Sequence, residues 1–82
     1  MDRQEIVEKI EAVIEEATDI PCDEMDEDSA LMDDLELSSL EIMTMIADLE
    51  TIFKVRISEN ALRDFITIGD IADFIQEYSK IQ

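Results

Sequence analysis

Ser38 and Glu41, at the start of an apolar stretch, constrain the fold more than any other pair of residues. Ser followed three residues later by Glu is the pattern of a capping box, in which both side chains bind backbone N–H groups that a helix start leaves without partners. The pattern predicts a helix from Ser39 to Phe53. It also places the Ser39 hydroxyl in solvent at the helix N-terminus, where the helix dipole favours an anion such as a phosphate ester.

This helix carries apolar residues on two sides. At about 100° per residue, one side collects the residues expected to face the core, Ile42, Met45, Ile46, Leu49, Ile52 and Phe53. The other side collects an outward stripe of Leu40, Met43 and Ala47, flanked by an acidic rim of Glu41, Asp48 and Glu50. A chain of 82 residues can seldom cover both sides of one helix, so we expect the outward stripe to be exposed. An apolar strip with an acidic rim is more typical of a docking surface than of scattered surface residues.

Three further helices are expected. Asp2 and Glu5 favour a capped start for a helix that runs to about Ala17 and ends before Pro21, since proline cannot continue a helix. Residues 54–58 form an extended connector, and a short helix follows from Ser58 or Glu59 to about Asp64. Phe65 and Ile66 are expected to cross the core.

The last helix should begin at the third capping box, formed by Thr67 and Asp70. Its apolar stripe follows helical spacing along Ile68, Ile71, Ala72, Ile75 and Tyr78. Gly69 lies in its first turn, where a missing side chain allows close packing. The predicted fold is therefore all-α, a small bundle of three longer helices and one short helix in a single domain of residues 1–82.

The acidic connection 21–37 is expected to be ordered, because Met25, Leu31 and Leu35 are spaced to enter the core. Asp26 and Asp28 begin a calcium-loop pattern, but alanine falls at the next ligand position and no glycine is near. We therefore expect no dedicated metal site here.

The net charge of −17 and the pI near 4.1 argue against nucleic acids and anionic membranes as partners and favour proteins with basic patches. No apolar run approaches 18 residues, so neither a membrane span nor a signal peptide is expected. The single Cys22 fits a reducing compartment. The chain is expected to be a cytoplasmic monomer.

Catalysis is not expected. The sequence contains no histidine, so it lacks the usual general base and any Ser–His or Cys–His pair, and it has no glycine-rich phosphate loop. With 23 acidic residues, close carboxylate pairs are inevitable and indicate a solvated surface rather than a catalytic site. We assign no catalytic residue.

The segment from Asp33-Asp34-Leu35 through Ser38-Ser39-Leu40-Glu41, followed by an amphipathic helix, resembles the phosphopantetheine-attachment region of acyl carrier proteins. The resemblance continues through Ile57 and the Thr67-Ile68-Gly69-Asp70 segment, so nearly the whole chain is covered. It implies a discrete carrier whose Ser39 takes 4′-phosphopantetheine from coenzyme A and holds acyl intermediates as thioesters for fatty-acid, polyketide or related biosynthesis.

The resemblance also implies partners, namely a phosphopantetheinyl transferase and acyl-transferring or condensing enzymes with basic patches. Leu40, Met43, Ala47 and Ile57 match family positions that contact partner enzymes, and the acidic rim of Glu41, Asp48 and Glu50 lies on the corresponding helix. The sequence departs from the family pattern where Ser38 replaces an aspartate, Glu36 a glycine and Thr44 an acidic residue. Two alternatives stay open: a peptidyl or aminoacyl carrier, and an unmodified acidic helical adaptor that binds basic proteins.

Overall fold

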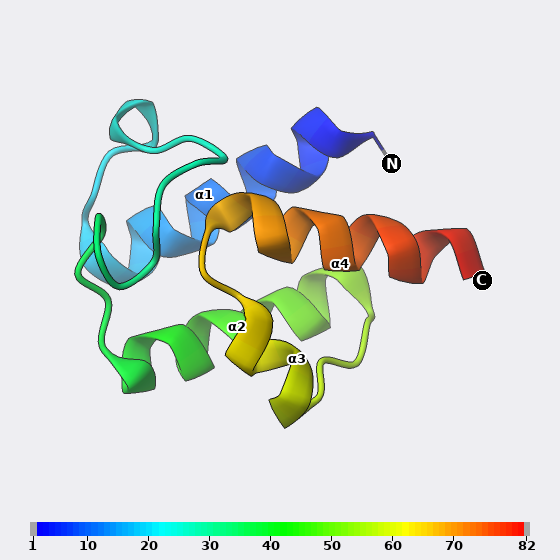
Figure 1. Ribbon diagram of the computed structural model, residues 1–82. Coiled ribbons are helices and arrows are strands. Elements are labelled where there is room, and N and C mark those ends of the chain that lie inside the picture. Colours follow the sequence, from blue (N-terminus) through cyan, green and yellow to red (C-terminus); the bar gives the residue numbers. More distant parts are fainter. Residues whose placement is uncertain (1, 82) are drawn as a thin grey trace.

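The computed structural model describes residues 2–81, and in these residues it contains four α-helices and no β-strand. The helices are α1 (Arg3–Thr18), α2 (Ser39–Phe53), α3 (Glu59–Asp64) and α4 (Ile68–Ile81), with a short 3₁₀ turn, η1 (Cys22–Glu24), after α1. Figure 1 shows α1, α4 and α2 packed together, the short α3 beside them, and the long connection closing one end of the bundle. The predicted all-α bundle is confirmed.

Each predicted helix start is made by the expected cap. The Asp2 carboxylate accepts the Glu5 N–H at 2.9 Å. In the box before α4, the Thr67 hydroxyl accepts the Asp70 N–H at 3.2 Å, and Asp70 Oδ2 accepts the Thr67 N–H at 3.0 Å. Because these bonds satisfy N–H groups that a helix cannot satisfy itself, the sequence defines where α1 and α4 begin.

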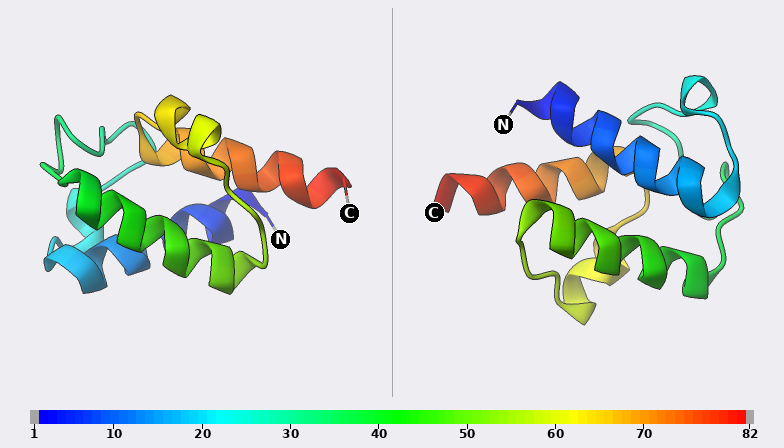
Figure 2. Two further views of the ribbon diagram at one scale, coloured as in Figure 1. Left: turned by 90° about the horizontal axis from the view of Figure 1, so that it is seen from below. Right: turned by 180° about the vertical axis from the view of Figure 1, so that it is seen from behind.

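Figure 2 shows how α1, α2 and α4 are arranged, and the buried core is made mostly of side chains from these three helices. Its fully buried side chains follow the predicted stripes and include Ile6, Ile10, Ile14, Met45, Leu49, Ile68, Ile71 and Ile75. Among the described residues no buried side-chain polar atom lacks a hydrogen-bond partner. Folding therefore buries a continuous apolar interior without a desolvation penalty for unpaired polar groups.

The connection between α1 and α2 is ordered, as predicted. Met25, Leu31 and Leu35 are buried, and so is Leu37, which the prediction omitted. The backbone of this connection is also tied to the start of α4, because the Leu31 N–H donates to the Ile66 carbonyl at 2.8 Å. These anchors fix the position from which the chain enters α2.

Two residues expected in the core lie outside it. Ile52 is 45% exposed because it lies at the edge of the α2 core stripe, roughly 70° from its centre at 100° per residue. Ile66 is 64% exposed, whereas Phe65 is half-buried and packs edge-on against Phe74 with ring centroids 5.7 Å apart. Adjacent side chains of an extended segment point in opposite directions, so only one of this pair can face inward.

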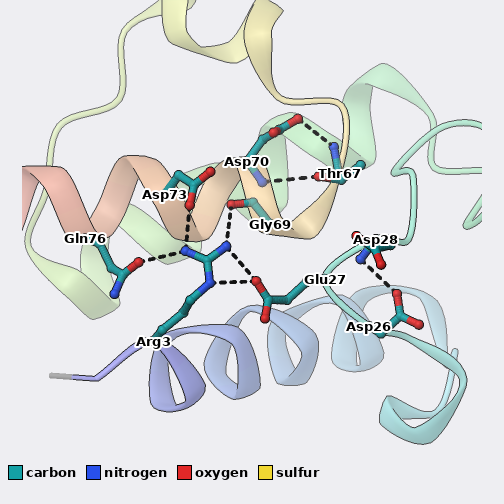
Figure 3. A network of polar contacts seen from close by, with 9 residues as sticks. All are labelled: Arg3, Asp26, Glu27, Asp28, Thr67, Gly69, Asp70, Asp73 and Gln76. Atoms are coloured by element: carbon teal, nitrogen blue, oxygen red, sulfur yellow. Dashed lines mark hydrogen bonds and ion pairs between the residues drawn. The ribbon is translucent and has the colours of Figure 1, made fainter.

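Gly69 allows α4 to approach the long connection, and not another helix as the expected close helix packing implied. Its N–H donates to the Glu27 carbonyl at 2.9 Å, and a Cβ on Gly69 would lie 3.1 Å from that same oxygen. Figure 3 shows this contact region beside Arg3. A larger residue at position 69 would push the loop away from α4.

Candidate functional site

Ser39 is the first residue of α2, and its side chain is exposed. The capping box uses the neighbouring serine instead: Ser38 Oγ accepts the Glu41 N–H at 3.2 Å, and Glu41 Oε1 accepts the Ser38 N–H at 2.9 Å. Among the side chains described, those of residues 2–78, the Ser39 hydroxyl has no hydrogen-bond partner. The structure thus holds one serine in the cap and leaves the next one accessible at a helix N-terminus, where an anion is favoured.

The backbone that leads to Ser39 is tightly held. Leu35 and Leu37 are both buried, while Glu36 between them has a φ of 56°, in the left-handed region. This conformation is readily adopted by glycine but costs other residues about 1–2 kcal/mol. The cost is tolerated because the two buried leucines and the Leu37 N–H bond to the Leu31 carbonyl, at 3.0 Å, fix the turn. The backbone position of Ser39 is therefore fixed by the turn that precedes it.

A pocket of about 410 Å³ opens beside Ser39. Its apolar wall is formed by Met32, Ile42, Met43, Leu62, Phe65 and Ile66. Asp33, Ser39 and Arg63 supply its polar lining. The size lies in the range of small-molecule sites, and the mixture of an apolar wall with a few polar groups is typical of them.

Sequence reasoning did not find this pocket, apart from Ser39 and Met43. Its walls come from the long connection, α2, α3 and the segment before α4, and no local periodicity reports how these segments meet. The exposure of Ile66, expected to be buried, was the missing signal, because its side chain lines the pocket rather than the core.

The outward stripe of α2 is exposed, as predicted. Leu40 is 73% and Met43 is 59% exposed, and Ala47 is also exposed. Met43 extends the stripe to the pocket beside Ser39. Met43 thus belongs both to the outward stripe and to the wall of this pocket.

The acidic rim is less uniform than the sequence suggests. Glu41 belongs to the capping box, and Glu50 Oε2 accepts the Ile57 N–H at 2.8 Å, which fixes the connector after α2. Asp48 is exposed and has no polar contact among the side chains that the structure describes, those of residues 2–78. Two of the three rim carboxylates therefore also hold backbone in place. Ile57 itself is half-buried against the core and lines a separate hollow with Arg56.

Other titratable groups give no sign of catalysis. Burial raises the pKa of the Cys22 thiol, and a bond to Glu15 and nearby acids raise this pKa further, so the thiol stays protonated at neutral pH. Among the residues described, no cluster of His, Cys, Asp and Glu is placed to hold a metal ion. No helix in residues 2–81 is both long and apolar enough to cross a membrane.

Comparison with known proteins agrees with this geometry. Residues 8–75 match the family model described as "Phosphopantetheine attachment site". The acyl carrier protein of Borreliella burgdorferi strain ZS7 is 38% identical over 77 residues, which cover 94% of this chain and 96% of that protein. The acyl carrier protein of Thermotoga maritima is 31% identical, with 92% of this chain and 93% of the relative covered.

A solved structure of the acyl carrier protein from Enterococcus faecalis has the same fold. It superposes with a TM-score of 0.79 at 28% sequence identity and covers 95% of this chain and 99% of its own. The group that attaches to the matched family is 4′-phosphopantetheine, and acyl carrier proteins are carriers rather than catalysts. The chain therefore belongs to the acyl carrier protein family.

Proposed function

We propose that Ser39 is the attachment site for 4′-phosphopantetheine. One observation supports this proposal above the others: of two adjacent serines, Ser38 is bound in the capping box, whereas the Ser39 side chain is exposed. The surroundings of Ser39 fit the group. A phosphodiester on Oγ would lie at the N-terminus of α2, near N–H groups that the helix does not use, and the arm beyond it would meet a pocket with an apolar wall.

In this account Ser39 acts as an acceptor. Its hydroxyl oxygen would bond to the phosphorus that carries the pantetheine arm in coenzyme A, the pyrophosphate bond would break, and adenosine 3′,5′-bisphosphate would leave. A phosphopantetheinyl transferase with Mg²⁺ would catalyse this step and take up the hydroxyl proton. When attached, the arm supplies a terminal thiol on which acyl intermediates are held as thioesters. The chain's own residues position the attachment point and shelter the cargo: Met43 and Leu62 line the pocket beside Ser39, and the flexible, buried Met45 can repack around an acyl chain between the helices.

The outward stripe of Leu40, Met43 and Ala47 is proposed to dock the transferase and the acyl-transferring or condensing enzymes. Its exposure supports this role, and Asp48 adds a charge that has no polar contact within the described residues. The net charge of −17 would steer enzymes with basic patches toward it. We further propose that residues 1–82 act as one monomeric cytoplasmic carrier domain for fatty-acid, polyketide or related biosynthesis.

The test is intact mass spectrometry of the chain after incubation with coenzyme A, Mg²⁺ and a broad-specificity transferase. We expect a gain equal to one phosphopantetheinyl group. Loading of an acyl group should then add a mass that neutral hydroxylamine removes, since hydroxylamine cleaves thioesters. A chain that binds basic proteins but never gains the arm would be the unmodified adaptor, and the carrier proposal would be wrong.

A further inference from the structure

Arg63 lies at the pocket beside Ser39 without a carboxylate partner. It is exposed in the last turn of α3, and among the side chains that the structure describes, those of residues 2–78, it forms no hydrogen bond or ion pair. Its guanidinium is therefore available to bind an anion at the pocket. Of the described basic residues, Arg63 is the one that lines this pocket.

One carboxylate beside Arg63 opposes an anion at Ser39, although the start of α2 favours one. Asp33 lines the same pocket, so a phosphodiester on Ser39 would add a second negative charge to one small space. Like charges at short range repel, and a guanidinium is the side chain best suited to bind phosphate oxygens through paired N–H donors. The pocket thus contains a carboxylate that would repel the phosphodiester, Asp33, and a guanidinium that could bind it, Arg63.

We propose that Arg63 binds the phosphodiester of the arm on Ser39 and folds the arm back against the apolar wall of the pocket. This inference rests on the proposed attachment at Ser39. The anionic end of the arm meets Arg63, and its methyl-bearing portion meets Met43 and Leu62 on the apolar wall. Arg63 is a positioning residue: it decides how often the arm lies on the carrier and how often it extends toward an enzyme.

A structural role for Arg63 makes a different prediction. A cation in the last turn of a helix interacts favourably with the helix dipole, and this would stabilise α3 whether or not the arm is attached. Such a role would change the melting of the unmodified chain and leave the arm's contacts unchanged.

The experiment uses the arm-bearing chain, with conversion first verified by intact mass. The measurements are nuclear Overhauser effects between the geminal methyl protons of the arm and the methyl groups of Met43 and Leu62, together with the ³¹P chemical shift. We expect these contacts in the parent chain, their loss in Arg63→Gln with a shifted ³¹P signal, and their partial return in Arg63→Lys. Arg56→Gln is the matched control, because Arg56 is also an exposed arginine and lines a separate hollow.

The outcomes separate this inference from the attachment proposal. A chain that never gains the arm overturns both. An Arg63→Gln chain that is fully converted and keeps the parent's contacts and ³¹P shift overturns the Arg63 inference alone. Should Arg63→Gln fail to fold, added salt on the arm-bearing parent serves instead: the contacts should weaken as the exposed pair is screened, and contacts indifferent to salt would contradict the inference.

Discussion

Arg3 at the start of α1 and Glu27 in the long connection form an ion pair 2.6 Å long, between residues 24 positions apart in the sequence. The same guanidinium donates to Asp73 Oδ1 at 2.6 Å and Gln76 Oε1 at 2.7 Å on α4, as Figure 3 shows. Bonds to Glu27 and Asp73 raise the pKa of Arg3 further above its already high ordinary value. One cation therefore joins three segments of a strongly acidic chain.

Arg3→Ala should lower the free energy of unfolding by about 1–2 kcal/mol. The estimate is modest because the Arg3 side chain is 34% exposed and solvent screens its ion pairs. Urea unfolding gives the measurement. Lys9→Ala is the control, because it removes one exposed cation with no polar contact in the described residues and changes the net charge equally. An Arg3→Ala chain as stable as the Lys9→Ala chain would show that the lost charge, and not the network, matters.

Glu11→Gln should stabilise the domain at pH 7. Partial burial, followed by repulsion from Asp26, Glu8 and Glu27, raises the pKa of Glu11 above its ordinary value of 4.5. Between 4.5 and the folded pKa the folded state binds more protons than the unfolded state, so ionised Glu11 costs stability that returns as the pH falls through this window.

The advantage of Glu11→Gln over the parent should therefore shrink as the pH falls toward 4.5. Unfolding of both chains across this pH range measures it, and Glu16→Gln, at an exposed position of the same helix, is the control. A Glu11→Gln chain less stable than its parent at pH 7 would contradict the expectation.

Leu49→Ala and Met43→Ala should differ sharply although both lie on α2. Leu49 is 0% exposed, so its truncation leaves a cavity and should cost about 2–5 kcal/mol. Met43 is 59% exposed, and its loss should leave the melting temperature close to that of the parent. Thermal unfolding followed by circular dichroism tests the pair. If Met43→Ala melted as early as Leu49→Ala, the two-sided description of α2 would fail.

The helices could be predicted from sequence because their signals are local. The Ser38–Glu41 box and the period of the apolar residues gave α2 its observed bounds, Ser39–Phe53. Ile52 and Ile66 were expected in the core because they are apolar, but both are exposed. Periodicity ranks residues by side of a helix, but it cannot say where neighbouring elements stop covering that side.

The geometry of the candidate site could be predicted only in part. The exposed position of Ser39 at the start of α2 followed from the cap, whereas the placement of Arg63 at the same pocket depends on how α3 packs near the start of α2. Likewise, the sequence pattern does not distinguish the three acidic residues of the rim from one another. The bond from the Ile57 N–H to Glu50 shows that side chains alike in sequence can have separate tasks in the fold.

Charge reversal at Asp48 should slow loading by the transferase without destabilising the domain. Asp48 is exposed and has no polar contact in the described residues, so Asp48→Lys removes a rim charge and little else. The defect should lie in the association rate and shrink in high salt. Glu41→Lys makes an instructive contrast, since it also breaks the capping box and should cost about 0.5–2 kcal/mol. Equal loading rates for Asp48→Lys and the parent at low salt would remove Asp48 from the docking surface.

Attachment at Ser39 is tested by comparing Ser39→Ala with Ser38→Ala by intact mass after incubation with coenzyme A, Mg²⁺ and a transferase. Ser39→Ala should gain no mass and melt like the parent, because the exposed Ser39 side chain has no hydrogen-bond partner within the described residues. Ser38→Ala should lose about 0.5–2 kcal/mol of stability with its cap, yet still gain one phosphopantetheinyl group. A mass gain in Ser39→Ala, or none in a folded Ser38→Ala chain, would contradict attachment at Ser39.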